Sequence, residues 1–234
     1  MYTFDSRIRY SECDSEGKLS LYALVNYFQD CSTFQSEDLG IGLEYLAARH
    51  QAWILVSWQI IIDRYPKMGE RVQIGTIPYV LKDFMGHRNF FMKTEDGETL
   101  AQANSLWTLF DMERMRPAHP SQEMIDGYVL GQRLDMEYAG RKIVIEEGGM
   151  EEAPVIVGRH QLDTNNHVNN GQYVNIATTF LPKDFVVKQM RVEYKKQAHL
   201  GDALIPYVVR SGEKCTISLR DSAGDVYINS EYIS

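Results

Sequence analysis

The stretch PVIVGRHQLDTNNHVNNGQYVNIATTF, residues 154–180, holds the pattern from which the fold is predicted. A short β-branched segment comes first, a turn rich in Asp and Asn follows, and apolar residues then recur at helical spacing until Pro182. The stretch YTFDSRIRYSECDSEGKLSLYALVNYF, residues 2–28, likewise has a short alternating segment, a polar turn and then apolar residues at helical spacing. Each stretch therefore predicts a short strand, a polar turn and an amphipathic helix.

The two stretches align residue by residue, which indicates an internal duplication. When Asp14 is placed on Asp163, Lys18 falls on His167 and Ser20 falls on Asn169. Further along each half, the turn RYPKMGERV falls on the turn KKQAHLGDAL with their glycines matched. We therefore expect two copies of one structural unit.

Strand signals follow the helix in both halves. From Trp53 to about Asp111 the chain is rich in β-branched and aromatic residues, and the turn signals KMGE, KDFMGH and EDGE divide it into four long antiparallel strands. A shorter helix is expected in GIGLEYLAARH, and further strands in FVVKQMRVEYKK, DALIPYVVR, KCTISLR and DVYINSEYI. The prediction is an α+β fold in which each half wraps its sheet around its own helix. Residues 1–125 would form the first unit, 126–150 a surface linker and 151–234 the second unit.

Composition excludes several classes of function. The formal net charge of −8 over 234 residues argues against nucleic acid as a partner. No apolar run is long enough for insertion into a membrane, and the N-terminus lacks a signal sequence, so a cytoplasmic location is expected. The three cysteines have neither disulfide nor zinc spacing, which indicates a reducing compartment. No metal or organic cofactor is expected.

The turn of the second copy carries the residues best suited to chemistry. Asp163, Asn165 and His167 alternate along the chain, so their side chains can share one side. A histidine is a natural general base for water, an amide can hold a carbonyl oxygen or the water, and a carboxylate can orient the others. Backbone N–H groups of Val168–Asn170, at the start of the helix, are expected to be free for an oxyanion. Water attack on an activated acyl group is the chemistry indicated.

A structural interpretation competes with this one. Asparagines before a helix are often caps or turn formers, and a single histidine is often structural. The first copy has Lys18 where the second has His167, so capping alone does not explain the difference, and the first unit is expected to be catalytically inert. The tryptophans Trp53, Trp58 and Trp107 are either core residues or the lining of an apolar substrate tunnel.

The motif LDTNNHVNNGQYV resembles the active-site motif of the acyl-ACP thioesterases of plant plastids and bacteria. The resemblance extends to AWILVSWQIIIDRYPKMGERVQI in the first half and to MRVEYKKQAHLGDAL in the second. It implies a double hotdog fold and hydrolysis of the thioester between a fatty acyl chain and acyl carrier protein. It also implies that Asp163, Asn165 and His167 match the family's catalytic residues.

One departure from the family pattern affects the expected mechanism. Plant members have a Glu-Cys pair where this chain has Gln197 and Ala198, so Gln197 can hold a water but cannot accept its proton. The base role then falls to His167. A thioesterase for acyl-CoA and a non-catalytic acyl-binding protein remain as alternatives, and a homodimer is left open. Lys195 and Lys196 are expected to meet the acidic carrier protein.

Overall fold

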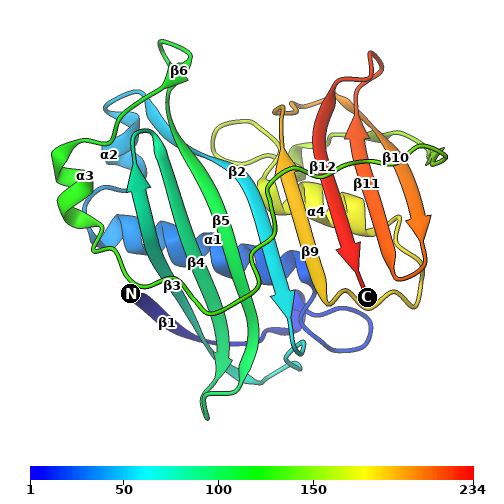
Figure 1. Ribbon diagram of the computed structural model, residues 1–234, viewed down its shortest axis with the longest axis horizontal. Helices are drawn as coiled ribbons and strands as arrows, with labels where there is room; N and C mark the ends of the chain where they lie inside the picture. Colours follow the sequence, from blue (N-terminus) through cyan, green and yellow to red (C-terminus); the bar gives the residue numbers. More distant parts are fainter. The chain divides into compact units, whose positions relative to one another are not determined.

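The computed structural model describes residues 1–234 and divides into two compact units. Unit 1 comprises Met1–Val56 and Ile62–Tyr138, and unit 2 comprises Ser57–Ile61 and Ala139–Ser234. Each unit is an antiparallel sheet with its main helix against one face, α1 in unit 1 and α4 in unit 2 (Figure 1). The predicted α+β class is confirmed.

The strands of unit 1 follow the order β1-β3-β4-β5, with β2 beside β5. Neighbouring strands are antiparallel, with Tyr2 opposite Thr76 and Val72 opposite Thr94. The four long strands expected between Trp53 and Asp111 are all present. The elements are β1 (Tyr2–Arg7), a 3-10 turn (Tyr10–Glu12), α1 (Leu21–Asp38), α2 (Leu43–Ala47), β2 (Gln51–Ile62), β3 (Arg71–Lys82), β4 (Met85–Thr94), β5 (Thr99–Asp111), β6 (Arg116–Pro117) and α3 (Gln122–Gly127).

Helix α1 is capped at its start by a serine side chain. The Ser20 hydroxyl accepts a hydrogen bond from the N–H of Ala23 at 3.2 Å, which satisfies one of the unpaired donors at the helix start. The apolar face of the helix is buried against the sheet, as the helical spacing of Leu24, Phe28 and Cys31 predicts.

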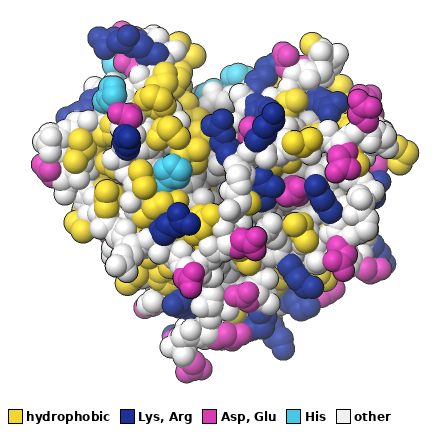
Figure 2. All heavy atoms as spheres, in the orientation of Figure 1, with side chains coloured by type: hydrophobic (Ala, Val, Ile, Leu, Met, Phe, Trp, Pro, Cys, Tyr) yellow, Lys and Arg dark blue, Asp and Glu magenta, His cyan; other side chains and the backbone are white.

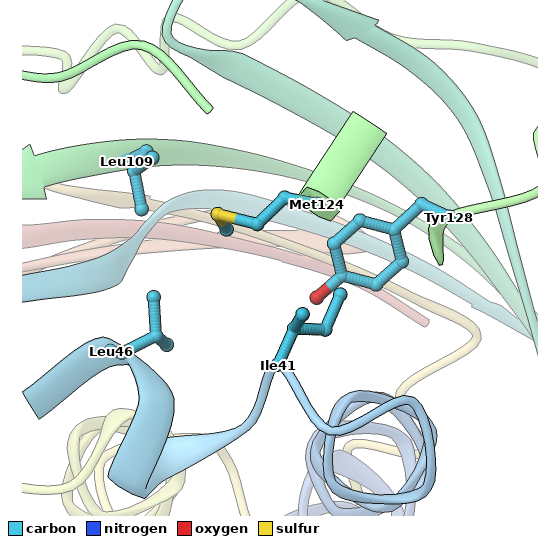
Figure 3. Packing of buried hydrophobic residues seen from close by; sticks show 5 residues of the cluster. All are labelled: Ile41, Leu46, Leu109, Met124 and Tyr128. Atoms are coloured by element: carbon cyan, nitrogen blue, oxygen red, sulfur yellow. The ribbon is translucent and has the colours of Figure 1, made fainter. Parts of the chain in front are cut away.

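A second apolar cluster lies between the short helices of unit 1 and the sheet. Its five buried members come from α2, α3, β5 and the segments beside the two helices (Figure 3): Ile41, Leu46, Leu109, Met124 and Tyr128. Trp53 and Leu81 pack against this cluster from the sheet. Burial of these side chains fixes α2 and α3, which have few residues and would not be stable alone.

Unit 2 repeats the arrangement with shorter elements. Residues Ser57–Ile61 of β2 pair with β9, and the sheet continues in the order β9-β12-β11-β10-β7. The predicted second helix and the four strands after it are confirmed. The elements are β7 (Met150–Glu151), β8 (Val155–Ile156), a 3-10 turn (Arg159–Gln161), α4 (Asn170–Thr178), β9 (Gln189–Tyr194), β10 (Ala203–Ser211), β11 (Lys214–Arg220) and β12 (Val226–Ile233).

The chain between α3 and β7 lies across the sheet faces opposite the helices (Figure 1). Arg88 and Asn89 are neighbours on β4 and therefore point to opposite faces. The Arg88 side chain bonds Gln35 of α1, while the Asn89 carboxamide accepts hydrogen bonds from the N–H of Leu134 and the hydroxyl of Tyr138, both at 3.0 Å. This segment is thus held by side chains of the sheet.

In unit 2 the same segment is bound in a similar way. The Gln59 side chain accepts from the N–H of Ala139 at 2.9 Å, and Arg191 on β9 donates to the carbonyls of Gly140 and Lys142. Arg191 also pairs with Glu231 at 2.8 Å, and both side chains are at most 15% exposed. Polar residues on this face of the sheet are therefore buried beneath the segment and have partners there.

No helix is both long and apolar enough to cross a membrane.

Candidate active site

The Asp163 carboxylate organises the turn that contains Asn165 and His167. Its Oδ1 atom accepts hydrogen bonds from the backbone N–H groups of Asn165 at 2.8 Å and His167 at 3.2 Å. The N–H of Asp163 donates to the carbonyl of His167 at 2.8 Å, which closes the turn. Asp163 thus holds the backbone of the loop.

Two asparagines in the loop have local structural roles. Asn166 has a positive φ of 61°, a conformation that asparagine tolerates better than most residues. Asn169 caps α4, since its Oδ1 accepts from the N–H of Gly171 at 2.8 Å. Asn165 has no such role for its side chain and is exposed. The abundance of asparagine therefore combines turn and cap residues with one side chain that remains available to a substrate.

The expectation of free N–H groups at the start of the helix is wrong for Val168 and Asn169. The N–H of Val168 donates to the carbonyl of Ala198 at 2.9 Å, and that of Asn169 donates to the carbonyl of Gln161 at 2.9 Å. These bonds tie the loop to neighbouring segments, so they compete with any oxyanion. The Asn165 carboxamide, by contrast, is exposed.

The His167 imidazole is partly buried and lies against a second histidine. The rings of His167 and His199 have centroids 4.9 Å apart and are nearly perpendicular, with an interplanar angle of 80°. Burial, and next the neighbouring His199, hold the pKa of His167 below its usual range, while the Asp163 carboxylate opposes them. His167 is therefore biased toward the neutral form that a general base requires.

The segment that carries Gln197 is fixed to the loop and to α4. The carbonyl of Ala198 accepts from Val168, and its N–H donates to the hydroxyl of Tyr173 at 2.7 Å. The Tyr194 hydroxyl donates to the carbonyl of Asn170 at 3.0 Å. The segment that carries Gln197 therefore lies next to the loop that carries Asn165 and His167.

Gln197 and His199 stand on either side of the buried Ala198. The Gln197 side chain is exposed and makes no hydrogen bond within the protein, so its amide is available to a water or a substrate. Sequence reasoning did not single out His199. The signal was present in the duplication, because the turn alignment places His199 on Lys67 just as the loop alignment places His167 on Lys18.

The three tryptophans have different surroundings. Trp58 is buried, 2% exposed, in the part of β2 that belongs to unit 2. In unit 1, Trp53 packs against the cluster beneath α2 and α3, and the indole N–H of Trp107 donates to the hydroxyl of Ser105 at 2.7 Å. Trp53 and Trp58 are thus packed in apolar surroundings, whereas Trp107 is bound through its polar atom.

The two lysines expected to meet the carrier protein, Lys195 and Lys196, both lie close to carboxylates. Lys196 contacts Asp221 at 2.5 Å and Asp225 at 3.5 Å, and Lys195 lies 3.6 Å from Glu193. On the face of unit 2 seen in Figure 2, cationic and anionic side chains alternate. Lys195 and Lys196 therefore do not form a basic patch on their own. No group of three or more His, Cys, Asp or Glu side chains is placed to hold a metal ion.

Solved structures share this architecture over the whole chain. An acyl-ACP thioesterase from Bacteroides thetaiotaomicron matches with a TM-score of 0.90 at 21% identity, covering 99% of this chain and 96% of that one. The 12:0-ACP thioesterase from Umbellularia californica matches with a TM-score of 0.86 at 19% identity, covering 99% and 96%. The fold is thus the expected double hotdog.

Sequence comparison identifies the family. The sequence model of the acyl-ACP thioesterase N-terminal domain matches residues 1–128, and that of the acyl-ACP thioesterase C-terminal domain matches residues 146–232. The chain belongs to the acyl-ACP thioesterase family.

Curated relatives of the chain are longer. The chloroplastic palmitoyl-acyl carrier protein thioesterase of Arabidopsis thaliana is 22% identical over 236 residues, which cover 94% of this chain and 57% of that protein. A chloroplastic acyl-ACP hydrolase of Cuphea viscosissima is 23% identical, with 84% and 51% covered. The chain thus spans little more than half the length of these relatives.

Proposed function

We propose that this protein hydrolyses fatty acyl thioesters of acyl carrier protein, releasing a free fatty acid and the carrier thiol. The observation that carries the proposal is the Asp163 turn, which fixes the backbone of Asn165 and His167 beside Gln197. Family membership supports the same reaction, since both named relatives are acyl-ACP hydrolases or thioesterases. A cytoplasmic location is part of the proposal, supported by three cysteines that are all free thiols.

In the proposed reaction, water attacks the carbonyl carbon of the thioester. His167 removes a proton from that water as the new C–O bond forms. The Asn165 carboxamide donates to the carbonyl oxygen as it becomes negative, and Gln197 hydrogen-bonds the attacking water. When the C–S bond breaks, the proton on His167 passes to the thiolate of the carrier's pantetheine arm.

Neither an enzyme nucleophile nor a carboxylate base is needed in this scheme. Ala198 has no nucleophilic atom, and the Asp163 Oδ1 atom is already bonded to two backbone N–H groups. Among these residues His167 is the one whose side chain can take a proton at neutral pH without losing a structural bond. Helix α4 begins three residues after His167, so its positive dipole favours negative charge that develops on the substrate.

The test is a thiol-release assay over a series of acyl carrier proteins loaded with saturated and unsaturated chains. Free thiol should appear in proportion to free fatty acid for at least one chain length. Parallel assays with the matching acyl-CoA measure the preference for the carrier. A higher kcat/KM on the acyl-CoA than on the matching acyl carrier protein would indicate an acyl-CoA thioesterase instead.

The replacement of a Glu-Cys pair by Gln197 and Ala198 favours one rival, a non-catalytic acyl-binding protein. Such a protein would bind the acyl chain but release no thiol. Binding of a fluorescent fatty acyl thioester, measured together with thiol release, separates the two. Saturable binding with no release above the uncatalysed rate would contradict the proposed hydrolysis.

A further inference from the structure

The contact between His167 and His199 is the feature of the site that the proposed mechanism has not used. The two rings meet edge to face at 4.9 Å between centroids. Perpendicular aromatic pairs of this kind are favourable because the positive edge of one ring faces the negative face of the other. The His167 ring makes no hydrogen bond to the protein, so this contact and the electrostatic effect of the Asp163 carboxylate are its specific interactions with neighbouring side chains.

His199 is itself held by an acidic turn. Its N–H donates to Asp202 Oδ2 at 2.9 Å, and its Nδ1 atom lies 3.9 Å from the same oxygen. The Tyr227 hydroxyl of β12 donates to that oxygen at 3.2 Å. The His199 side chain is 61% exposed, so this anchoring, rather than burial, places its ring.

The duplication supports a specific role for the pair. In unit 1 the residues equivalent to His167 and His199 are Lys18 and Lys67, which form a β-bridge. The anchoring bond is also repeated, because the N–H of Lys67 donates to Glu70 at 2.9 Å. The fold therefore brings these two positions together in both units, but only unit 2 has imidazoles there.

We propose that His199 is a positioning residue, whose ring holds the His167 imidazole in the orientation in which it takes the proton of the attacking water. The inference rests on the proposed hydrolysis and adds to it. The site needs such support because the Asp163 carboxylate bonds backbone rather than the His167 ring, and Gln197 makes no bond to it. His199 gains or loses no proton in the reaction, so the balance of the hydrolysis is unchanged.

Titratable groups near this pair come from several elements. Asp163 lies on the loop, Asp202 on the turn that holds His199, Tyr227 on β12 and Tyr173 on α4. Because His199 is one of the two causes that lower the pKa of His167, its removal should raise that pKa. The acid limb of the pH profile of kcat/KM should then move to higher pH.

The experiment compares His199→Ala and His199→Phe with the wild type, using Lys67→Ala as the matched control in unit 1. Loss of the ring should lower kcat by roughly threefold to tenfold with little change in KM. The phenylalanine variant, which keeps an aromatic edge and face, should recover most of kcat. Lys67→Ala should not differ from the wild type.

Two results would overturn the proposal: an unchanged kcat in His199→Ala, or a phenylalanine variant as slow as the alanine one. An NMR titration of the His167 ring gives a readout that does not depend on turnover. In His199→Ala the ring signals should shift and the pKa should rise, and unchanged signals would also contradict the contact. If the wild type releases no thiol while these signals change as expected, the proposed hydrolysis fails and the ring contact stands.

Discussion

The loop 14–20 of unit 1 and the loop 163–169 of unit 2 have nearly the same backbone and different chemistry. In both, an aspartate Oδ1 accepts from the N–H groups two and four residues later, at 2.9 and 3.1 Å in the first and 2.8 and 3.2 Å in the second. In both, the residue at the midpoint has positive φ, 73° at Gly17 and 61° at Asn166. Both also end in a capped helix.

The difference lies in the side chains that this shared backbone presents. The first loop presents Glu16 and Lys18, which bond each other at 2.8 Å, whereas the second presents Asn165 and His167, which have no partner on the loop. An ion pair satisfies its own groups and leaves little to offer a substrate. The comparison therefore teaches that the loop is a structural frame, and that function depends on which side chains it leaves unpaired.

The strongest test of this comparison is removal of the imidazole. His167→Ala should lower kcat/KM for acyl carrier protein substrates by at least about 100-fold, because the general base is lost. Lys18→Ala, the matched change in unit 1, should change it little, since an exposed ion pair contributes little. Thermal unfolding of both variants verifies that the fold is kept. A greater loss in Lys18→Ala would place the site in the other unit.

The shared frame can be tested with the two aspartates. Asp163→Ala and Asp14→Ala each remove two backbone hydrogen bonds, so each should lower the free energy of unfolding by about 1 kcal/mol. Only Asp163→Ala should also reduce kcat, by roughly tenfold, because it frees the backbone that positions Asn165 and His167. Urea denaturation and steady-state kinetics measure the two effects. Equal kinetic losses would mean that both loops serve the active site.

Gln197 should have a smaller effect, because it is exposed and holds water without taking its proton. Gln197→Ala should lower kcat severalfold and leave acyl binding unchanged. Gln197→Glu should keep or improve kcat, since a carboxylate can bind the same water and accept its proton. Tyr65→Phe is the matched control, as Tyr65 is the equivalent residue in unit 1. A wild-type rate in Gln197→Ala would remove this residue from the site.

The smallest expected effect concerns pH. Because the pKa of His167 is lowered, the neutral base persists as the pH falls, and kcat/KM should decline only below the ordinary imidazole pKa. Because the pKa of His167 is lower in the folded protein, the unfolded chain binds a proton at this residue more readily. The contribution of His167 to the free energy of unfolding should therefore fall as the pH drops below the ordinary imidazole pKa. A pH–rate profile and denaturation at several pH values measure these effects, and His167→Ala should flatten the stability change.

Much of this fold could be predicted because the sequence repeats it. The alignment of Asp14 with Asp163 places both turns and both helix caps correctly, since each feature needs a particular side chain at a particular position. The segment after α3 was harder to predict. Its backbone is held by hydrogen bonds to side chains far away in sequence, such as those of Asn89 and Gln59. No periodic pattern within the segment itself indicates such bonds.

The site was predicted in part for the same reason. Asp163, Asn165 and His167 lie within one turn, so local spacing places them together. His199 comes from a different turn, and its contact with His167 depends on the bond between Val168 and Ala198, which joins the two segments. The N–H groups of Val168 and Asn169 were wrongly expected to be free for a related reason. Val168 donates to the carbonyl of Ala198, and Asn169 donates to the carbonyl of Gln161.

The division of β2 has a consequence for any attempt to isolate the units as fragments. Residues Ser57–Ile61 belong to unit 2 and pair with β9, although the rest of the strand belongs to unit 1. A fragment cut from Ala139 onward would carry the whole candidate site but lack this strand, and β9 would become a sheet edge with unpaired backbone groups. Such edges promote aggregation. The half that carries the candidate site is therefore a poor module for transplantation, and engineering of this site requires the intact chain.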